Sequence, residues 1–417
     1  MRFLYTLLLW LLLPFIFVRL ALRGRRQPEY LQHIGERFGF YPVATTGPLI
    51  WLHAVSVGET RATVSLVAKL RAAYPDCRIL LTHTTPTGRA TSEQLYGDGV
   101  MRAYLPYDYP FAVRRFLRHF QPKIGILMET EIWFNLIHAG HDAGIPMLLL
   151  NARLSEKSAN GYARFAGLTR NALKELGGIA AQTSDDAARL TGLGAVQVSV
   201  MGNLKFDIEP PQSMLELGHS LRRKFGVSRK IFLAASTRDG EEALVLDAFQ
   251  ASGGMDEMLL VIVPRHPQRF TEIADMLAKR SLRYQRRSEN READPDIQVV
   301  LGDSMGEMFA YYAAADLAFI GGSLLPFGGQ NLIEACSVGT PVLTGPHTYN
   351  FADATRLAVE AGAAVQVSDA PELFSVAQKL LNDVDALTAM RKQCVQFVAS
   401  HQGATGKAMT VIAAALR

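Results

Sequence analysis

Hydrophobic and polar positions alternate along most of the chain with the rhythm of strands and helices in a parallel sheet. From about residue 48 onward, short apolar runs are separated by amphipathic stretches long enough to form helices. The first series of predicted strands covers 49–56, 78–84, 101–107, 124–129, 146–151, 178–182 and 196–201. The second series covers 231–235, 258–263, 297–301, 317–320, 341–343 and 364–367. This alternation predicts parallel sheets covered by helices on both faces.

A proline-rich joint lies between the two series of strands. The segment Ile208-Glu-Pro-Pro-Gln-Ser213 has the composition of a domain boundary, and 417 residues are too many for one ordinary core. We therefore expect an α/β protein of GT-B architecture, in which two Rossmann-like, doubly wound domains face each other across a cleft. The predicted domains cover residues 23–208 and 209–417, after a membrane anchor at residues 1–22.

The anchor is predicted from the first residues, which form one apolar run. Phe3–Val18 is slightly short for a membrane-spanning helix, and Leu20–Leu22 extends it. Arginines follow at positions 19, 23, 25 and 26. A cleaved signal peptide is the alternative, but these basic residues stand where its cleavage site needs small ones. Arginines there also hold the following chain in the cytoplasm, so we expect an uncleaved anchor with a cytoplasmic body.

Composition and charge exclude some classes of protein. The three cysteines, Cys77, Cys336 and Cys394, are scattered, which favours a reducing compartment and excludes a disulfide scaffold. A net charge of +4 fits an anionic substrate or a membrane surface. The basic stretch at 279–291 is interleaved with acidic residues, so we expect a solvated helix end and loop there and no nucleic-acid partner.

Glu59 stands after the first predicted strand, in the first turn of the helix that follows. Ligands of open α/β sheets bind at the carboxyl ends of the strands, and Gly58 allows the backbone to approach a ligand closely. A helix N-terminus lowers the pKa of a carboxylate and keeps it ionised, able to accept a proton. The alternative is structural, because an acid in the first turn also stabilises the helix itself.

Two further groups follow later strands of the first domain. Glu129 and Glu131 stand at the end of the strand at 124–129, and they should point in opposite directions if the strand continues. One of them would then face the cleft. Lys205 precedes the interdomain joint and could bind a phosphate or a substrate carboxylate, while an ion pair with Asp207 is an equally open alternative.

The second domain has several loops suited to a nucleotide. Ser236 and Thr237 follow a strand and open a helix, where hydroxyls and free N–H groups form an anion site; Ser236 as a simple helix cap is the alternative. Pro264 and Arg265 follow the next strand, in a loop that also holds His266 and Arg269. The glycine-rich loop Gly321–Glu334 leads into a helix and can offer N–H groups to phosphate and a carboxylate to ribose.

Metal sites find little support in the sequence. The ten histidines show no metal-binding spacing. The pairs Asp294/Asp296 and Asp383/Asp385 match the DxD pattern of metal-dependent sugar transferases, but both lie in charged loops away from strand ends. We therefore expect neither a metal nor another cofactor.

Taken together, the motifs resemble the 3-deoxy-D-manno-octulosonic acid (Kdo) transferases of lipopolysaccharide assembly. The resemblance covers nearly the whole chain, including the anchor and its arginines. The motifs that carry it are HAVSVGE (53–59), TPTG (85–88), METEIW (128–133), NLKFD (203–207), ASTRDGEE (235–242), VPRH (263–266), GDSMGE (302–307), GGSLLPFGGQNLIE (321–334) and GPHTYNF (345–351).

The resemblance implies an inverting glycosyltransferase that moves Kdo from CMP-Kdo to a lipid A precursor (lipid IVA) at the cytoplasmic face of the inner membrane. The first domain would take the lipid acceptor and the second the donor. Glu59 would be the general base, and Glu129 and Lys205 would stabilise the transition state. The CMP-Kdo-binding residues would be Ser236, Thr237, Pro264, Arg265, Met305, Gly306, Glu307, Asn331, Leu332, Ile333 and Glu334.

Two positions depart from the family pattern. Phe134 replaces the proline of a Trp-Pro-Asn motif, and Gln330 stands where histidine is common.

Two other functions compete with this one. A GT-B transferase for a UDP-sugar would share the second-domain loops but should not need Glu129, Lys205 and the anchor together. A non-catalytic, anchored nucleotide-binding protein would tolerate the loss of Glu59.

Overall fold

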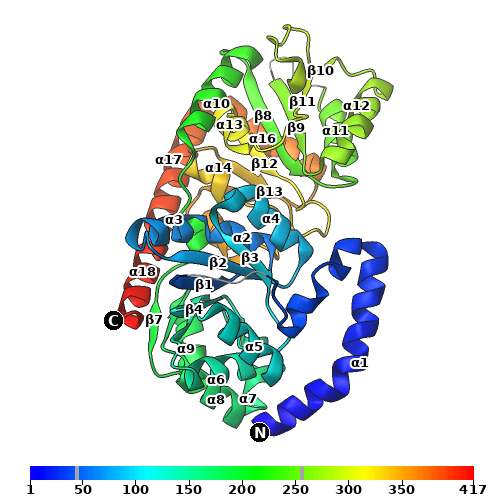
Figure 1. Ribbon diagram of the computed structural model, residues 1–417. Coiled ribbons are helices and arrows are strands. Elements are labelled where there is room, and N and C mark those ends of the chain that lie inside the picture. Colours follow the sequence, from blue (N-terminus) through cyan, green and yellow to red (C-terminus); the bar gives the residue numbers. More distant parts are fainter. Residues whose placement is uncertain (43–46, 254–257) are drawn as a thin grey trace. The chain divides into compact units, whose positions relative to one another are not determined.

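The computed structural model describes residues 1–42, 47–253 and 258–417 (Figure 1). The chain forms two compact units: unit 1 contains Met1–Asp207 and His401–Arg417, and unit 2 contains Ile208–Ser400. The chain passes from one unit to the other at the proline-rich joint. Residues 401–417, which we expected in the second domain, instead belong to unit 1.

Unit 1 contains the first of the two expected parallel sheets, with seven strands in the order β3-β2-β1-β4-β5-β6-β7. The strands are β1 (Leu49–His53), β2 (Arg78–His83), β3 (Met101–Tyr104), β4 (Ile124–Met128), β5 (Met147–Ala152), β6 (Gly178–Ala181) and β7 (Val198–Val200). The chain starts in the middle of the sheet, runs to one edge and returns, so the strand order reverses between β1 and β4. Open α/β sheets bind their ligands at such a reversal.

Helices cover both faces of this sheet because every strand around β1 is apolar on both sides. Leu49 and Trp51 pack with residues of α5, α6 and α8, while Ile50 and Leu52 pack with residues of α3 and the C-terminal α18. The helices of unit 1 are α1 (Arg2–Arg26), η1 (Pro28–Leu31), η2 (Ile34–Phe38), α2 (Val57–Ala62), α3 (Val64–Ala73), α4 (Pro86–Tyr96), η3 (Gly97–Gly99), α5 (Pro110–Phe120), α6 (Phe134–Asp142), α7 (Glu156–Ala163), α8 (Ala166–Glu175), α9 (Ser184–Gly192), η4 (Leu204–Phe206) and α18 (Ala404–Ala415). Covering the second face therefore requires the chain to return to unit 1 at its end.

Unit 2 contains the second seven-stranded parallel sheet, in the order β10-β11-β9-β8-β12-β13-β14. The strands are β8 (Lys230–Thr237), β9 (Met258–Pro264), β10 (Tyr284–Arg286), β11 (Val299–Leu301), β12 (Leu317–Ile320), β13 (Val342–Thr344) and β14 (Ala364–Gln366). β10 lies inside the basic stretch that we expected to be a helix end and a loop. That expectation was wrong for these residues, which pair in parallel with β11 at the edge of the sheet.

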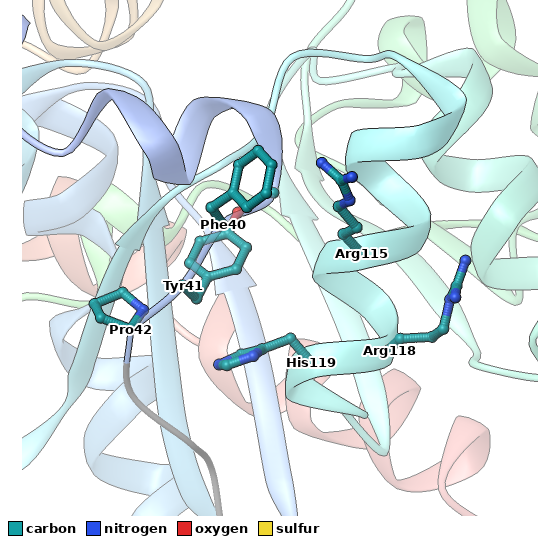
Figure 2. Close-up of a pocket in the computed structure, with 7 residues that line it drawn as sticks. Phe40, Tyr41, Pro42, Arg115, Arg118 and His119 are labelled. Atoms are coloured by element: carbon teal, nitrogen blue, oxygen red, sulfur yellow. The ribbon is translucent and has the colours of Figure 1, made fainter.

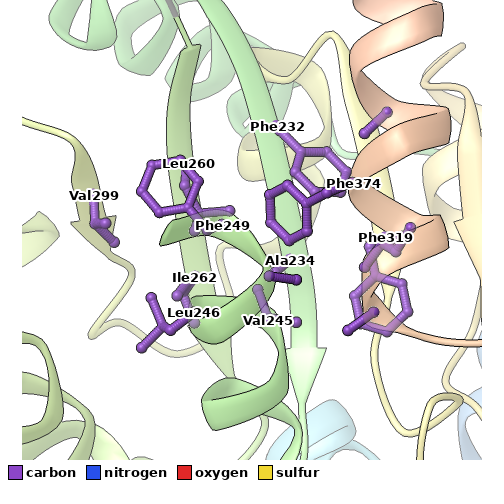
Figure 3. Close-up of a cluster of buried hydrophobic side chains, with 14 of the residues drawn as sticks. Phe232, Ala234, Val245, Leu246, Phe249, Leu260, Ile262, Val299, Phe319 and Phe374 are labelled. Atoms are coloured by element: carbon purple, nitrogen blue, oxygen red, sulfur yellow. The ribbon is translucent and has the colours of Figure 1, made fainter. Parts of the chain in front are cut away.

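The core of unit 2 is built around aromatic side chains between the sheet and its helices (Figure 3). The Phe374 ring meets that of Phe232 edge-on, with centroids 5.5 Å apart, and lies 6.0 Å from that of Phe249. Such buried pairs stabilise a core beyond the area that they bury. The helices of unit 2 are α10 (Gln212–Phe225), α11 (Glu241–Ala251), η5 (Pro267–Arg269), α12 (Phe270–Lys279), η6 (Arg287–Glu289), α13 (Met308–Ala314), α14 (Ile333–Ser337), α15 (Ala352–Glu360), α16 (Ala370–Asn382) and α17 (Val384–His401), which ends in unit 1.

The N-terminal apolar run forms one long helix, α1, which lies alongside the rest of unit 1 (Figure 1). Residues 2–25 are long and apolar enough to cross a membrane. The residues with reduced exposure recur every three or four positions, as expected for one face of a helix, at 5, 6, 9, 13, 16 and 20. The helix therefore has a face that contacts unit 1 and an apolar face that is exposed.

A buried carboxylate fastens the first turns of α1 to unit 1. Asp108 accepts hydrogen bonds from the Tyr5 hydroxyl (2.9 Å) and from the N–H groups of Asn135 (3.0 Å) and Leu136 (2.8 Å) at the start of α6. Burial raises the pKa of Asp108 to about 7 in spite of these bonds. The Phe134 ring meets the Tyr5 ring edge-on at 5.1 Å, so the departure from the Trp-Pro-Asn pattern adds a contact with α1.

The exposed face of α1 should control membrane attachment. We expect the triple variant Leu8→Asn, Leu11→Asn, Phe15→Asn to move from the membrane fraction to the soluble fraction with its melting temperature nearly unchanged. These side chains are 54%, 70% and 63% exposed, so unit 1 loses little packing. Removing each of them from lipid should cost roughly 1.5–3 kcal/mol of membrane affinity. Fractionation of cell lysates measures the distribution.

A matched control replaces apolar residues with the same exposure elsewhere in the chain. Val196, Val227 and Val384 are 70%, 69% and 73% exposed, and their triple replacement by Asn should leave the protein with the membranes. Retention of the α1 variant in the membrane fraction would show that the helix is not the anchor.

Candidate active site

Glu59 lies at the carboxyl end of β1, beside the reversal of strand order. The hydroxyl of Ser56, the N-cap of α2, accepts a hydrogen bond from the Glu59 N–H (3.3 Å). The Glu59 carboxylate in turn accepts from the Val55 N–H (2.7 Å) and from the Ser56 hydroxyl (3.1 Å). Glu59 is 9% exposed. It therefore does stabilise its helix, as the structural alternative held, and the same bonds fix its carboxylate at the sheet edge.

Glu129 and Lys205 meet beside Glu59, although they come from distant segments. β4, the neighbour of β1, ends at Met128, and Glu129 follows in the left-handed conformation with φ of 57°. Lys205 belongs to the short helix η4, which follows β7 at the far edge of the sheet. The Lys205 Nζ lies 3.6 Å from Glu129 Oε1. The structure thus brings together the residues predicted from HAVSVGE, METEIW and NLKFD.

Asp207 has another role than the ion pair with Lys205 that the sequence left open. Its carboxylate accepts hydrogen bonds from the N–H groups of Gly403 (2.7 Å) and Thr405, at the start of α18. Carboxylates are favourable at helix N-termini because free N–H groups point toward them. The Asp207 carboxylate therefore ties the segment after Lys205 to the returning C-terminal helix.

The position of Lys205 depends on two asparagines, neither of which was among the predicted site residues. The Asn203 side chain accepts a hydrogen bond from the Lys205 N–H (3.0 Å). Asn151, fully buried at the end of β5, accepts one from the Leu204 N–H (3.0 Å). Asn151 also has a positive φ, of 53°. A polar residue that ends an apolar strand was the available signal for Asn151.

Glu131 also lies near Glu59, contrary to the expectation that Glu129 and Glu131 point in opposite directions. That expectation assumed a strand that continues, whereas the left-handed Glu129 turns the chain. The Glu131 carboxylate accepts a hydrogen bond from the Trp133 indole (2.6 Å) and lies 3.8 Å from His53 Nε2. His53, which is completely buried in β1, was not among the predicted site residues.

Burial and the neighbouring carboxylates together place the pKa of Glu59 near neutrality. Desolvation by burial raises it most, and the negative charges of Glu129 and Glu131 raise it further, while the bonds from Val55 and Ser56 lower it. The result is a pKa of about 7, above the usual value of 4.5. This reverses the predicted effect of the helix N-terminus. A carboxylate with this pKa suits general acid–base chemistry at neutral pH.

The nucleotide-binding candidates of unit 2 gather at the carboxyl ends of neighbouring strands. β8 ends at Ser236 and Thr237, β9 ends at Pro264 with Arg265 directly after it, and β12 leads into the loop at 321–334. These strands are neighbours in the order β9-β8-β12. The strand order reverses between β8 and β12, so unit 2 repeats the arrangement that positions Glu59 and Glu129 in unit 1.

The two hydroxyl groups that were expected to form an anion site after β8 are arranged differently from the prediction. Ser236 has a φ of 55°, and α11 starts only at Glu241 with Gly240 as its N-cap, so Ser236 does not cap this helix. The Thr237 hydroxyl donates a hydrogen bond to the Glu242 carboxylate (2.8 Å). The two hydroxyls therefore do not flank a helix N-terminus with free N–H groups.

Glu241 occupies part of the glycine-rich loop. Its fully buried carboxylate accepts hydrogen bonds from the N–H groups of Gly322 (2.6 Å) and Leu324 (2.9 Å). We had expected N–H groups of this loop to bind phosphate, but these two are satisfied inside the protein. The sequence pattern does not indicate that a buried carboxylate will accept hydrogen bonds from these N–H groups.

Positive charge gathers after β9. The N–H of Arg265 donates a hydrogen bond to the Thr237 carbonyl (2.9 Å), which joins the β8 and β9 ends. Desolvation and then the positive charges of Arg238, Arg265 and Arg269 lower the pKa of His266. Because Arg269 is paired with the carboxylates of Asp239, Glu242 and Glu272, the cations of this group that suit an anionic ligand are Arg238 and Arg265.

Met305, Gly306 and Glu307 follow β11. Gly306 has a φ of 81°, which favours glycine, and Met305 is 56% exposed. Glu307 is already engaged: one carboxylate oxygen lies 3.3 Å from Arg287 and the other accepts a hydrogen bond from the Ser304 hydroxyl (2.6 Å). The groups of this turn that remain open to a ligand therefore include its backbone and the exposed Met305 side chain.

Asn331, Leu332, Ile333 and Glu334 form the entry to α14. The Asn331 amide donates a hydrogen bond to the Glu334 carboxylate (3.1 Å), and its oxygen accepts one from the Ile333 N–H (3.1 Å). Leu332 and Ile333 are buried. Asn331 and Glu334 are therefore the polar side chains that this segment can present to a ribose.

Metal ligands and a second pocket add no further site. Among the described residues, no three or more His, Cys, Asp or Glu side chains form a cluster that could hold a metal ion. A wide pocket of about 580 Å³ is lined by Phe40, Tyr41 and Pro42 and, from α5, Arg115, Arg118 and His119 (Figure 2). It contains none of the predicted site residues.

Comparison with protein families gives two matches. Residues 32–208 match the family model "3-Deoxy-D-manno-octulosonic-acid transferase (kdotransferase)", and residues 241–397 match "Glycosyl transferases group 1". The 3-deoxy-D-manno-octulosonic acid transferase of Bordetella pertussis is 43% identical over 99% of this chain and 98% of its own length. That of Haemophilus influenzae is 37% identical over 99% and 98%.

Solved structures support the predicted GT-B fold. UDP-GlcNAc 2-epimerase from Neisseria meningitidis matches with a TM-score of 0.59 at 15% identity, over 87% of this chain and 99% of that chain. Acinetobacter baumannii MurG matches with a TM-score of 0.55 at 11% identity, over 88% and 99%. At these identities the similarity concerns the fold alone.

Replacing Glu59 with Gln should change how stability depends on pH. Because the folded-state pKa is about 7 and the usual value is 4.5, the folded protein binds the extra proton between these values, and this carboxyl makes wild type less stable as pH rises through them. The amide keeps an oxygen acceptor but never carries the charge. We expect the melting temperature of Glu59→Gln, relative to wild type, to rise between pH 5 and pH 8, by the equivalent of on the order of 3 kcal/mol. An equal difference at both pH values would contradict the raised pKa.

Proposed function

The chain belongs to the 3-deoxy-D-manno-octulosonic acid transferase family, and we propose that it transfers Kdo from CMP-Kdo to a lipid A precursor, lipid IVA, in lipopolysaccharide biosynthesis. Support comes from relatives that match over almost their whole length and from the convergence of Glu59, Glu129 and Lys205.

The observation that carries the mechanism is the buried Glu59 carboxylate with a pKa of about 7. In our proposal it is the general base. A lipid hydroxyl that attacks the anomeric carbon of Kdo must lose its proton, and a base with a pKa near the operating pH accepts that proton efficiently. Attack from the face opposite the leaving CMP would invert the anomeric centre. The bonds from Val55 and Ser56 hold the base in one orientation.

Lys205 and Glu129 supply the charge next to this base. The Kdo carboxylate needs a cation, and we assign this role to Lys205. Glu129 holds the ammonium group through the ion pair, and its negative charge favours positive charge that develops on the sugar ring in the transition state. The same negative charge raises the pKa of Glu59, so Glu129 contributes to both steps.

Unit 2 would bind the donor. In this proposal Arg265 binds the phosphate of CMP as CMP leaves. Ser236, Thr237 and Pro264 lie beside it at the ends of β8 and β9. Met305–Glu307 and Asn331–Glu334 would contact the nucleoside. CMP-Kdo carries a single phosphate, so a cation that bridges a diphosphate is not required, and arginines can neutralise the leaving charge. We therefore propose a transfer that needs no divalent metal.

The membrane-facing element would be α1. Its contacts with the rest of unit 1 run from Tyr5 to Leu20. Because α1 is held along most of its length in this way, a position in the membrane surface suits it. The exposed apolar residues would enter the lipid and the arginines after residue 18 would stay among the headgroups. We place the catalytic units on the cytoplasmic side of the inner membrane, where arginines are retained.

Incubating the purified protein with CMP-Kdo and lipid IVA tests the proposed reaction. Mass spectrometry of the lipid should show the addition of Kdo, and the rate should be nearly unchanged in excess EDTA. An unmodified lipid would contradict the proposed acceptor, and a rate that is lost in EDTA and restored by Mg²⁺ would contradict metal independence. UDP-GlcNAc, offered as donor in the same assay, should give no product.

A further inference from the structure

A second cavity in unit 1 lies between α1 and the carboxyl edge of the sheet. Its volume is about 250 Å³. Ile16 and Leu20 contribute an apolar wall from α1, and Leu105 and Trp133 also line the cavity. The cavity also borders the catalytic residues: it is lined by Val55, whose N–H binds the Glu59 carboxylate (2.7 Å), and by Glu131.

Arg37 lines this cavity and has hydrogen-bonding groups without partners. The residue is 4% exposed. Its Nη1 donates to the Thr84 carbonyl (3.1 Å), and its guanidinium lies 4.1 Å from the centre of the Tyr104 ring. Its Nε and Nη2 are buried and have no hydrogen-bond partner within the described part of the chain. A buried cation with unused donors is costly unless an anion completes it.

No carboxylate of the described chain supplies that anion. Glu36, its neighbour in η2, binds the Arg89 guanidinium (2.9 Å) and the Tyr104 N–H (2.7 Å) instead. Glu131, on the same cavity, accepts its hydrogen bond from Trp133. Within residues 1–42, 47–253 and 258–417, no ion pair of Arg37 with an acidic side chain is found.

Two more arginines face the same cavity from α1. Arg19 and Arg23 both line it, and their exposed side chains follow the apolar part of the helix. Arg23 lies 5.4 Å from the centre of the Tyr30 ring. Three guanidinium groups against one negative charge, that of Glu131, give the cavity a positive end. Guanidinium groups match the geometry of phosphate oxygens and can bind them by paired hydrogen bonds.

We propose that this cavity binds a phosphate monoester carried by the acylated sugar acceptor, a proposal that rests on the transfer to a lipid acceptor described above. The positive end takes the phosphate at the level of the membrane surface. The apolar wall of α1 then contacts the first carbons of an acyl chain, and the acceptor hydroxyl points toward Glu59. α1 is in this view part of the acceptor site as well as the anchor.

The test compares two forms of the acceptor lipid, one phosphorylated and one treated with a phosphatase. With the full-length enzyme in detergent micelles, Arg37→Met should raise the KM for the phosphorylated lipid about 10–100-fold, as expected for lost hydrogen bonds to a charged group. The KM for CMP-Kdo should not change. With the dephosphorylated lipid, wild type and variant should have the same KM.

Two other variants separate recognition from folding. Arg19→Gln with Arg23→Gln changes only exposed residues and should raise the same KM in the same direction. Arg25→Gln removes a charge from the same helix end without touching the cavity, and its KM should stay within about twofold of wild type. Equal effects on both lipids, or an effect on the KM for CMP-Kdo, would overturn the proposal.

A binding measurement keeps the inference independent of the reaction. The melting temperature of wild type should rise with the phosphorylated lipid and not with the dephosphorylated one, and Arg37→Met should abolish the rise. If the lipid stabilises the protein in this way but no transfer occurs, the proposed function fails and the cavity assignment stands. If transfer occurs but phosphate makes no difference to binding or KM, the assignment fails alone.

Discussion

Parallel strands that all end at one edge of a sheet determine where chemistry can occur in this protein. Because β1 and β4 are neighbours at the reversal of strand order, the residues that follow them, Glu59 and Glu129, lie close together although far apart in sequence. β7 delivers Lys205 to the same group. Both faces of the sheet are buried, so α18 must return from the end of unit 2 to complete the core.

The bonds that stabilise the β1–α2 turn also determine the chemistry of Glu59. Val55 and Ser56 donate to its carboxylate and favour the charged form, whereas burial and two neighbouring carboxylates disfavour it more strongly. An exposed first-turn glutamate would have a lowered pKa and would be a weak base. Here the same residue stabilises the first turn of its helix and has a pKa of about 7, so the structural and catalytic explanations do not exclude each other.

Much of the fold and the main candidate residues could be predicted, because apolar strands and the motifs at their ends are local signals. The predictions that failed concerned contacts between residues that are distant in sequence. β10 is a short edge strand of polar residues whose partner β11 is known only from the fold. The chain turns at Glu129 because this residue is left-handed. Asp207 accepts a hydrogen bond from the start of α18, which is distant in sequence. Glu241 accepts hydrogen bonds from the loop N–H groups that were expected to bind phosphate. The pattern of apolar and polar positions does not indicate these contacts.

The central claim is that Glu59 removes the proton from the attacking hydroxyl, and turnover of Glu59→Gln tests it most directly. Measured from pH 6 to pH 9, wild-type turnover should rise through about pH 7 as Glu59 ionises. Glu59→Gln should be slower by about 10²–10⁴-fold and lack this rise, while CMP binding on the same sample stays unchanged. Near-normal turnover of Glu59→Gln with the same pH profile would contradict the account.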